Sequence, residues 1–246
     1  MCRHLAYVGA AVPLHDLLFG APHALARQAE RPRHQQSGDT NPDGWGVAWY
    51  THGADEPQLY RTVTPIWDDA EFARQSDDIS CTAVLAAARL ASPGASIDVT
   101  GNAPFVEGRW AFSLNGIVHG FAEGIGDELR ARIDPDRRAR LVGDADTEVL
   151  FALVLQLIDS GMAPDQALVQ VVRDVLAITT GRLNLLLTDG TTVYATRWGN
   201  SLFRAGALVA SEPLDSQLAW EEVRDESVVS REANGRRSRS FRKETA

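Results

Sequence analysis

The second residue of the chain is a cysteine, Cys2, directly after the initiator methionine. That methionine is normally removed before a small residue, so we expect Cys2 to carry both a thiol and a free α-amine. An α-amine titrates near neutral pH and can act as a base, and a thiolate is a strong nucleophile. Taken alone, the residue fits either an incidental cysteine or N-terminal nucleophilic catalysis, in which one residue supplies both the nucleophile and the base.

A single arginine, Arg89, stands near the end of an otherwise apolar run at residues 81–90. A guanidinium in such surroundings needs a partner, because burying an unpaired charge costs free energy. A carboxylate fits, since it accepts two parallel hydrogen bonds from arginine. From the residues alone, that carboxylate belongs either to an internal Asp or Glu or to a substrate.

Two further motifs carry polar groups at the ends of expected elements. Asn115-Gly116 offers a side-chain amide and a flexible backbone N–H, which together could hold a developing oxyanion. The same dipeptide is typical of a tight hairpin turn. Asp146 opens an expected helix, where it either caps the N-terminus or faces the ammonium of a substrate. Both interpretations remain open for both motifs.

The chain lacks the common signatures of metal and nucleotide sites. Cys2 with His4 would form only half of a metal site, and the other histidines and Cys81 lack zinc-like spacing. There is no Walker loop and no G-x-G-x-x-G. We therefore expect no metal and no cofactor.

Charge and hydropathy exclude several classes of partner. The 246 residues have a net charge of −9, although residues 231–246 hold six of the 24 basic residues and two of the 33 acidic ones. The remainder is therefore strongly acidic and poorly suited to nucleic acid. No apolar run approaches the roughly 20 residues that span a bilayer. Residues 5–14 make a poor secretory signal, because charged residues interrupt the segment that follows. We expect a cytoplasmic protein with a small-molecule substrate and no nucleic-acid or membrane partner. The sequence leaves open whether the protein forms a homo-oligomer.

The elements that must position these residues alternate between strands and helices. The first half of the chain predicts strands at residues 2–10, 44–50, 58–63 and 109–115. The apolar run at residues 81–90 fits a buried strand or a helix, and its β-branched start and flanking turn residues favour the strand. Residues 20–43 are rich in Pro, Gly, Arg and Gln and predict a long irregular loop, and short helices are expected at residues 12–18 and 68–75.

The second half predicts helices at residues 146–158 and 164–176, then strands at 182–188, 193–198, 202–204 and 207–210. Strands, two helices and more strands indicate the α+β class, with helices packed on antiparallel sheets. We expect one catalytic domain over residues 2–230 and a disordered basic tail over residues 231–246.

The order of the motifs resembles that of a known family. Met-Cys, the D-G-W-G turn at residues 43–46, an arginine after an apolar strand, L-N-G at 114–116 and D-T-E at 146–148 follow one another. This set resembles the glutaminase domain of class II glutamine amidotransferases, which are N-terminal nucleophile hydrolases, over about residues 2–220. The resemblance implies a four-layer αββα sandwich of two antiparallel sheets flanked by helices.

The resemblance also implies a role for each matching residue. Cys2 matches the nucleophile, and Asn115 and Gly116 match the oxyanion hole. Arg89 matches the clamp of the substrate α-carboxylate, and Asp146 matches the acid that holds the α-ammonium. Ser92 matches the position where amidotransferases often have a threonine near the substrate α-carboxylate. Two positions depart from several ammonia-transferring relatives, because Pro93 and Leu114 stand where those relatives have histidine.

Longer stretches narrow the resemblance further. NPDGWGVAWY, TRWGNSLF and VASEPLD are similar to the ergothioneine-pathway branch of the family. This branch releases glutamate from γ-glutamyl-hercynylcysteine sulfoxide, which implies a hydrolase. Because the glutaminase-like region fills the chain, we expect it to act alone. The alternatives are a glutaminase subunit that supplies ammonia to a separate synthase, and a catalytically silent γ-glutamyl-binding relative.

Overall fold

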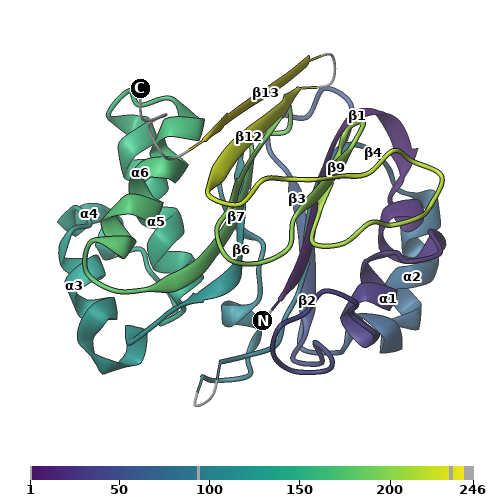
Figure 1. Cartoon of the computed structure of the whole chain (residues 1–246). Helices are drawn as coiled ribbons and strands as arrows, with labels where there is room; N and C mark the ends of the chain where they lie inside the picture. The colour runs from purple at the N-terminus through teal and green to yellow at the C-terminus, as the bar shows by residue number, and fades with distance from the viewer. Residues whose placement is uncertain (1, 93–94, 233–234, 241–246) are drawn as a thin grey trace.

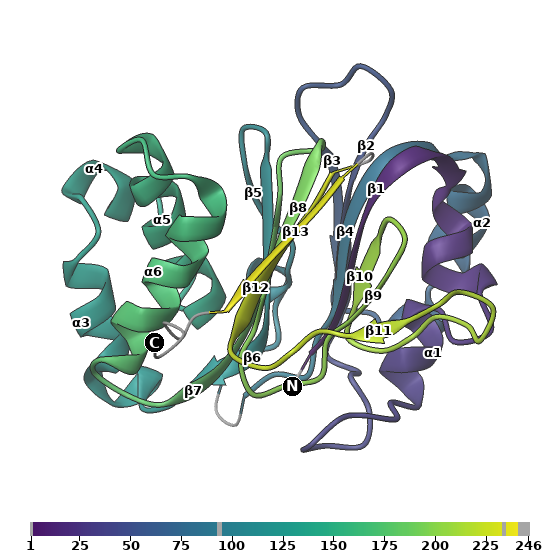
Figure 2. The same cartoon turned by 45° about the horizontal axis from the view of Figure 1, so that its top comes forward.

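Two antiparallel sheets lie face to face, and a layer of helices covers the outer face of each (Figure 1). The computed structural model describes residues 2–92, 95–232 and 235–240, the last range by its backbone alone. Turning the molecule separates the four layers clearly (Figure 2). The expected αββα sandwich is confirmed.

The first sheet has the order β11-β9-β10-β1-β4-β2-β3. Its strands are β1 (Arg3–Pro13), β2 (Trp45–Tyr50), β3 (Gln58–Thr62), β4 (Ser80–Ala88), β9 (Phe203–Ala205), β10 (Leu208–Ala210) and β11 (Glu221–Glu222). The apolar run predicted as a strand is β4, which pairs with β1 on one side and β2 on the other. A central strand that is covered on both faces has a continuous apolar run, and in β4 all residues from 83 to 88 are apolar and buried.

The second sheet has the order β13-β12-β8-β7-β6-β5. Its strands are β5 (Phe105–Glu107), β6 (Trp110–Val118), β7 (Gly181–Thr188), β8 (Thr192–Arg197), β12 (Ser227–Glu232) and β13 (Gly235–Ser240). All recorded strand pairs in this sheet are antiparallel.

The helices divide between the two outer faces (Figure 2). Beside the first sheet lie α1 (Leu25–Glu30) and α2 (Ala70–Gln75). Beside the second lie α3 (Gly126–Ala131), α4 (Pro135–Arg138), α5 (Asp146–Asp159) and α6 (Pro164–Leu176). Short π-helical turns cover Asp16–Gly20 and Phe121–Ile125, and 3₁₀ turns cover Ile66–Asp68, Ser76–Asp78 and Val99–Gly101. Within the described residues, no helix is long and apolar enough to cross a membrane.

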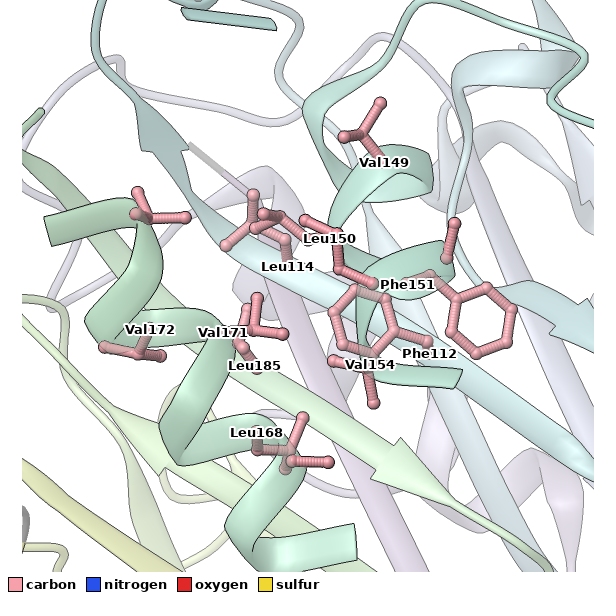
Figure 3. Close-up of a cluster of buried hydrophobic side chains, with 14 of the residues drawn as sticks. Phe112, Leu114, Val149, Leu150, Phe151, Val154, Leu168, Val171, Val172 and Leu185 are labelled. Atoms are coloured by element: carbon pink, nitrogen blue, oxygen red, sulfur yellow. The ribbon is translucent and has the colours of Figure 1, made fainter. Parts of the chain in front are cut away.

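Three apolar layers hold these elements together. Figure 3 shows the layer between α5, α6 and the second sheet, where Phe112 stacks on Phe151 with ring centroids 5.3 Å apart. The layer between the sheets is built largely from alanine and valine, including Ala6 and Ala83. Small side chains let the sheets approach closely, so the ends of β1, β4 and β6 can share one site.

Three expectations need correction. Residues 20–43 are not wholly irregular, because α1 buries Leu25 and Ala29 against the first sheet. Asn115-Gly116 is not a hairpin turn, because β6 continues to Val118 and Gly116 pairs with Leu183.

The third correction concerns the basic tail. We expected disorder from residue 231, whereas β12 continues to Glu232 and pairs with β8 and β13. Val228 and Val229 are buried on opposite faces of β12, which fixes this strand in the sheet. The domain boundary expected at residue 230 therefore falls inside a strand. Residues 241–246 lie outside the described residues.

Candidate active site

A cavity of about 460 Å³ opens where β1 begins, β4 and β6 end, and α5 starts. This volume is in the range of small-molecule sites. Five of the six predicted site residues line it, and the sixth does not. The lining residues are Cys2, Arg89, Ser92, Gly116 and Asp146.

Cys2 lies directly before β1, is partly exposed, and has a free thiol. The next residue anchors its backbone, because Arg3 Nε donates to the Cys2 carbonyl at 2.9 Å. Arg3 Nη1 in turn pairs with Glu212 Oε1 at 2.9 Å, and both side chains are fully buried. The nucleophile candidate therefore sits at the end of a buried ion pair.

Glu212 is the centre of that buried network. Its carboxylate accepts hydrogen bonds from His23 Nε2 at 2.7 Å and from the backbone N–H groups of Arg33 and His34. Burial alone would raise the pKa of Glu212, but these hydrogen bonds and the charge of Arg3 lower it to about 2. The carboxylate therefore stays ionised and holds residues 33–34 against the start of β1.

His4 lies one residue further along β1 and is fully buried. Its Nδ1 lies 3.0 Å from Ser113 Oγ on β6. Burial, with the nearby charge of Arg3, lowers the pKa of His4 to about 3, so its ring is neutral at ordinary pH. Among the described residues, no three His, Cys, Asp or Glu side chains meet in a group that could hold a metal ion.

Arg89 follows the last residue of β4, and the acceptors that its guanidinium meets among the described residues are neutral. Nη1 donates to Asn102 Oδ1 at 3.3 Å, and Nη2 donates to the Ser96 carbonyl at 3.0 Å. Within the described residues, no carboxylate lies within ion-pair distance of it. Gly101 packs beneath it, since a Cβ there would lie 2.9 Å from both terminal nitrogens. Of the two partners that the sequence allowed, an internal Asp or Glu is therefore not found among the described residues, and a substrate carboxylate remains.

The D-G-W-G motif fixes the backbone of Arg89. Gly44 O accepts from the Arg89 N–H at 2.8 Å, and Asp43 N–H donates to the Arg89 carbonyl at 3.0 Å. Gly44 has a φ of +102°, and a Cβ there would lie 2.2 Å from Asn102 Nδ2. Only glycine fits this position. The motif acts by placing the arginine.

Asp146 is the first residue of α5, so it does not cap the helix, whose N-cap is Ala145. Its Oδ2 accepts from Val118 N–H at 3.2 Å, and its Oδ1 accepts from Thr147 N–H at 2.7 Å. Burial raises the pKa of Asp146, and the hydrogen bonds and the charge of Arg89 offset this only in part. A cation placed beside the carboxylate would relieve that cost.

Asn115 and Gly116 occupy opposite faces of β6, because successive residues of a strand alternate. Gly116 lines the cavity, and a Cβ there would lie 1.7 Å from Arg182 O on β7. Asn115 is fully buried and does not line the cavity. Its Nδ2 donates to Ser211 Oγ at 3.2 Å. An amide nitrogen carries two hydrogens, so one of them is not used by Ser211.

The sequence predictions missed two residues of the site. Asn102 is fully buried and joins Arg89 to β3, since its Nδ2 donates to Thr62 O at 2.7 Å. Gly101 lies beside it, beneath the guanidinium. Neither residue falls in a motif, and only the tertiary contact with Arg89 reveals them. Beyond the charged pair, the cavity extends past His119, Phe121, Glu123 and Asp144.

Comparison with known proteins identifies the family of the chain. Residues 28–205 match the family model described as class II glutamine amidotransferases. The chain is 34% identical to the gamma-glutamyl-hercynylcysteine sulfoxide hydrolase of Mycolicibacterium smegmatis, over 93% of this chain and 95% of that protein.

Two solved structures support the fold. A glutamine aminotransferase class-II domain protein from Silicibacter pomeroyi has a TM-score of 0.69 and 28% identity, covering 98% of this chain and 100% of that one. The glutamine phosphoribosylpyrophosphate amidotransferase of Bacillus subtilis has a TM-score of 0.65 over 98% of this chain and 49% of its own. At 14% identity, the second likeness concerns the fold alone. The chain belongs to the class II glutamine amidotransferases, a family of amidohydrolases with the N-terminal nucleophile hydrolase fold.

Proposed function

We propose that this protein hydrolyses the γ-glutamyl amide of γ-glutamyl-hercynylcysteine sulfoxide through a thioester on Cys2. One observation carries the proposal. A guanidinium and a carboxylate, Arg89 and Asp146, line one cavity with the thiol, and within the described residues neither is in an ion pair. A γ-glutamyl group has the matching charges, because its α-carbon carries a carboxylate and an ammonium.

The charged pair binds the α-carbon end of the substrate. Arg89 takes the α-carboxylate through parallel hydrogen bonds, and Asp146 takes the α-ammonium. Ser92 lies on the same wall and supports the carboxylate. With that end fixed, the side chain of the glutamyl group places its γ-carbonyl beside Cys2. Positioning of this kind supplies much of the rate of an acyl transfer.

The reaction then proceeds in two halves. The α-amine of mature Cys2 takes the thiol proton, and the thiolate attacks the γ-carbonyl. The oxyanion accepts a hydrogen bond from Gly116 N–H, which lines the cavity, and a second from the Asn115 Nδ2 hydrogen that Ser211 does not take, although Asn115 itself does not line the cavity. The C–N bond breaks, the protonated α-amine of Cys2 gives its proton to the leaving amine, and a thioester remains on Cys2. Water, deprotonated by the same amine, attacks the thioester and releases glutamate.

The choice of leaving group rests on two further facts. The cavity continues past His119 and Phe121, which leaves room for a group larger than ammonia. The similar protein from Mycolicibacterium smegmatis is named for this sulfoxide substrate. Contacts to a large leaving group help to position the scissile carbonyl, so glutamine should lose kcat as well as affinity.

A substrate panel tests the proposal. Glutamate release is measured for glutamine, glutathione, γ-glutamyl-hercynylcysteine and its sulfoxide, each with the wild type and with Cys2→Ala. We expect the sulfoxide to give the highest kcat/KM and Cys2→Ala to give none. Equal or better turnover of glutamine would overturn the substrate assignment and support an ammonia-supplying subunit instead.

A further inference from the structure

A chain of buried polar side chains lies directly behind Asn115, outside the cavity. Asn115, Asn184 and Ser211 are fully buried, and Asn200 is 2% exposed. Burying so many amides and hydroxyls costs free energy unless their hydrogen bonds are satisfied. Two of these residues, Asn200 and Ser211, come from the G-N-S-L-F and V-A-S-E stretches, to which the proposed chemistry gives no role.

We propose that Asn200 and Ser211 are positioning residues that fix the orientation of the Asn115 amide and so aim its N–H at the oxyanion. The inference rests on the proposed function, because it requires Asn115 to be an oxyanion donor. It adds two residues to the machinery, neither of which lines the cavity.

The amide of Asn115 needs such a device because its two ends have nearly the same shape. Turning it by half a rotation exchanges a donor for an acceptor at little steric cost. Asn200 Nδ2 lies 3.3 Å from Asn115 Oδ1 and donates to the Asn115 backbone carbonyl at 2.9 Å. In the turned orientation two N–H groups would face each other. Asn200 therefore selects the orientation that leaves Nδ2 on the other side.

Asn200 is itself held in place by Asn184 on β7. Asn184 Nδ2 donates to the carbonyls of Asn200 and Ser201 at 3.2 and 3.1 Å. Asn184 Oδ1 accepts from the backbone N–H groups of Trp198 and Asn200. The turn after β8 is thereby fastened to the strand beside β6. These bonds fix the backbone of Asn200, and so the point from which its side chain reaches Asn115.

Ser211 connects the same amide to the strand that carries the nucleophile. Its Oγ accepts from Asn115 Nδ2 at 3.2 Å and from His4 N–H at 3.0 Å. Its own N–H donates to the His4 carbonyl at 2.9 Å. One hydroxyl thus links the oxyanion donor to β1, two residues after Cys2. This link holds the donor and the nucleophile in register.

The test measures kcat and KM for Asn200→Asp and Ser211→Ala, with the sulfoxide and with glutamine. Asn200→Asp keeps the shape but replaces the donor that faces Asn115 with acceptors. We expect kcat to fall about 10-fold to 100-fold in each variant, less than the 10²–10³ typical for losing an oxyanion donor. KM should change less than about twofold, because the α-carbon contacts are untouched.

A matched control removes a buried hydroxyl elsewhere. Ser76 is fully buried beside α2, where its Oγ donates to Ala73 O at 2.7 Å. Ser76→Ala should lower the thermal midpoint as Ser211→Ala does, while kcat stays near the wild type. If Ser211→Ala and Asn200→Asp also keep wild-type kcat, so that any fall in kcat/KM comes from a raised KM, the inference is wrong.

A second readout separates the inference from the proposed substrate. The electrophile 6-diazo-5-oxo-norleucine presents a ketone where the amide carbonyl would lie, so its alkylation rate reports on the oxyanion contacts for any γ-glutamyl substrate. Asn115→Ala should slow this alkylation, and Asn200→Asp and Ser211→Ala should slow it in the same direction. If Asn115→Ala has no effect, the proposed oxyanion role fails. If Asn115→Ala slows alkylation and the other two variants do not, only the positioning role fails.

Discussion

Two arginines lie side by side at the same end of the first sheet and have opposite surroundings. Arg3 on β1 is paired in register with Ala88, the residue before Arg89. Arg3 is fully buried against the Glu212 carboxylate, whereas Arg89 opens into the cavity and, in the part of the chain that the structure describes, donates to neutral acceptors. A charge that is paired inside the protein holds the structure together. A charged group such as the Arg89 guanidinium, which is held in place by hydrogen bonds but is in no ion pair with a described residue, is available to a ligand.

Breaking the internal pair should cause the largest effect, and the effect should be on stability. Arg3→Ala removes the arginine that offsets the charge of the buried Glu212 carboxylate, which costs about 3–5 kcal/mol of unfolding free energy. Arg27→Ala, which breaks the exposed pair with Glu30, should cost less than about 1 kcal/mol. Urea unfolding of both variants measures the difference. Equal losses would mean that the buried pair is not a structural anchor.

The cavity arginine should show the reverse pattern. Arg89→Lys keeps the charge but loses the planar fork, so kcat/KM should fall by an amount worth about 2–4 kcal/mol. The unfolding free energy should change by less than about 1 kcal/mol, because no buried carboxylate loses its partner. Steady-state kinetics and urea unfolding check the two halves, with Arg74→Lys on α2 as an exposed control. Wild-type kcat/KM in Arg89→Lys would make Arg89 structural.

The two carboxylates of the comparison differ in the direction of their pKa shifts. The pKa of Glu212 is lowered to about 2, against about 4.3 in an unfolded chain. Its stabilising contribution is therefore fully present above about pH 5 and is lost as the pH falls toward 2. The unfolding free energies of wild type and Glu212→Gln should differ most near neutral pH and converge in acid. A difference independent of pH would contradict this assignment.

Asp146 should show its raised pKa in ligand binding, with a smaller effect. The ammonium of glutamine needs an ionised Asp146, so affinity should fall as the pH drops through the raised pKa of that group. Titration calorimetry with Cys2→Ala avoids turnover. As the pH is lowered, we expect the affinity to weaken severalfold before the pH reaches roughly 3.9, the pKa of an ordinary aspartate. Affinity that stays constant through this range would remove Asp146 from the ammonium site.

Sequence patterns predicted the parts of this molecule that local chemistry defines. The apolar run before Arg89 favoured a buried strand over a helix, and the order of Cys2, the D-G-W-G turn and Asp146 resembled that of the family. The contact that Gly44 of the D-G-W-G motif makes could not be predicted, because its partner Asn102 lies far along the chain. The network behind Cys2 depends on Arg3 and Glu212, which are 209 residues apart.

The failures share one cause, which is that local preference does not record long-range neighbours. Asn115-Gly116 has the composition of a turn, but β7 lies so close behind Gly116 that only glycine fits. Strands β12 and β13 are rich in arginine and serine, and they join the sheet through backbone pairing, β12 with β8 and β13 with β12. Helix α1 is only six residues long and is surrounded by residues that favour loops.

The central claim is that Cys2 is the nucleophile, and a comparison of the two thiols tests it most directly. Cys81 is fully buried, and burial raises its pKa to about 12, so it should be inert. After exposure to 6-diazo-5-oxo-norleucine, intact-mass and peptide analysis should find one adduct, on Cys2, in protein whose initiator methionine has been removed. Cys2→Ala should gain none and release no glutamate from the sulfoxide. An adduct on Cys81, or turnover that survives in Cys2→Ala, would contradict the account.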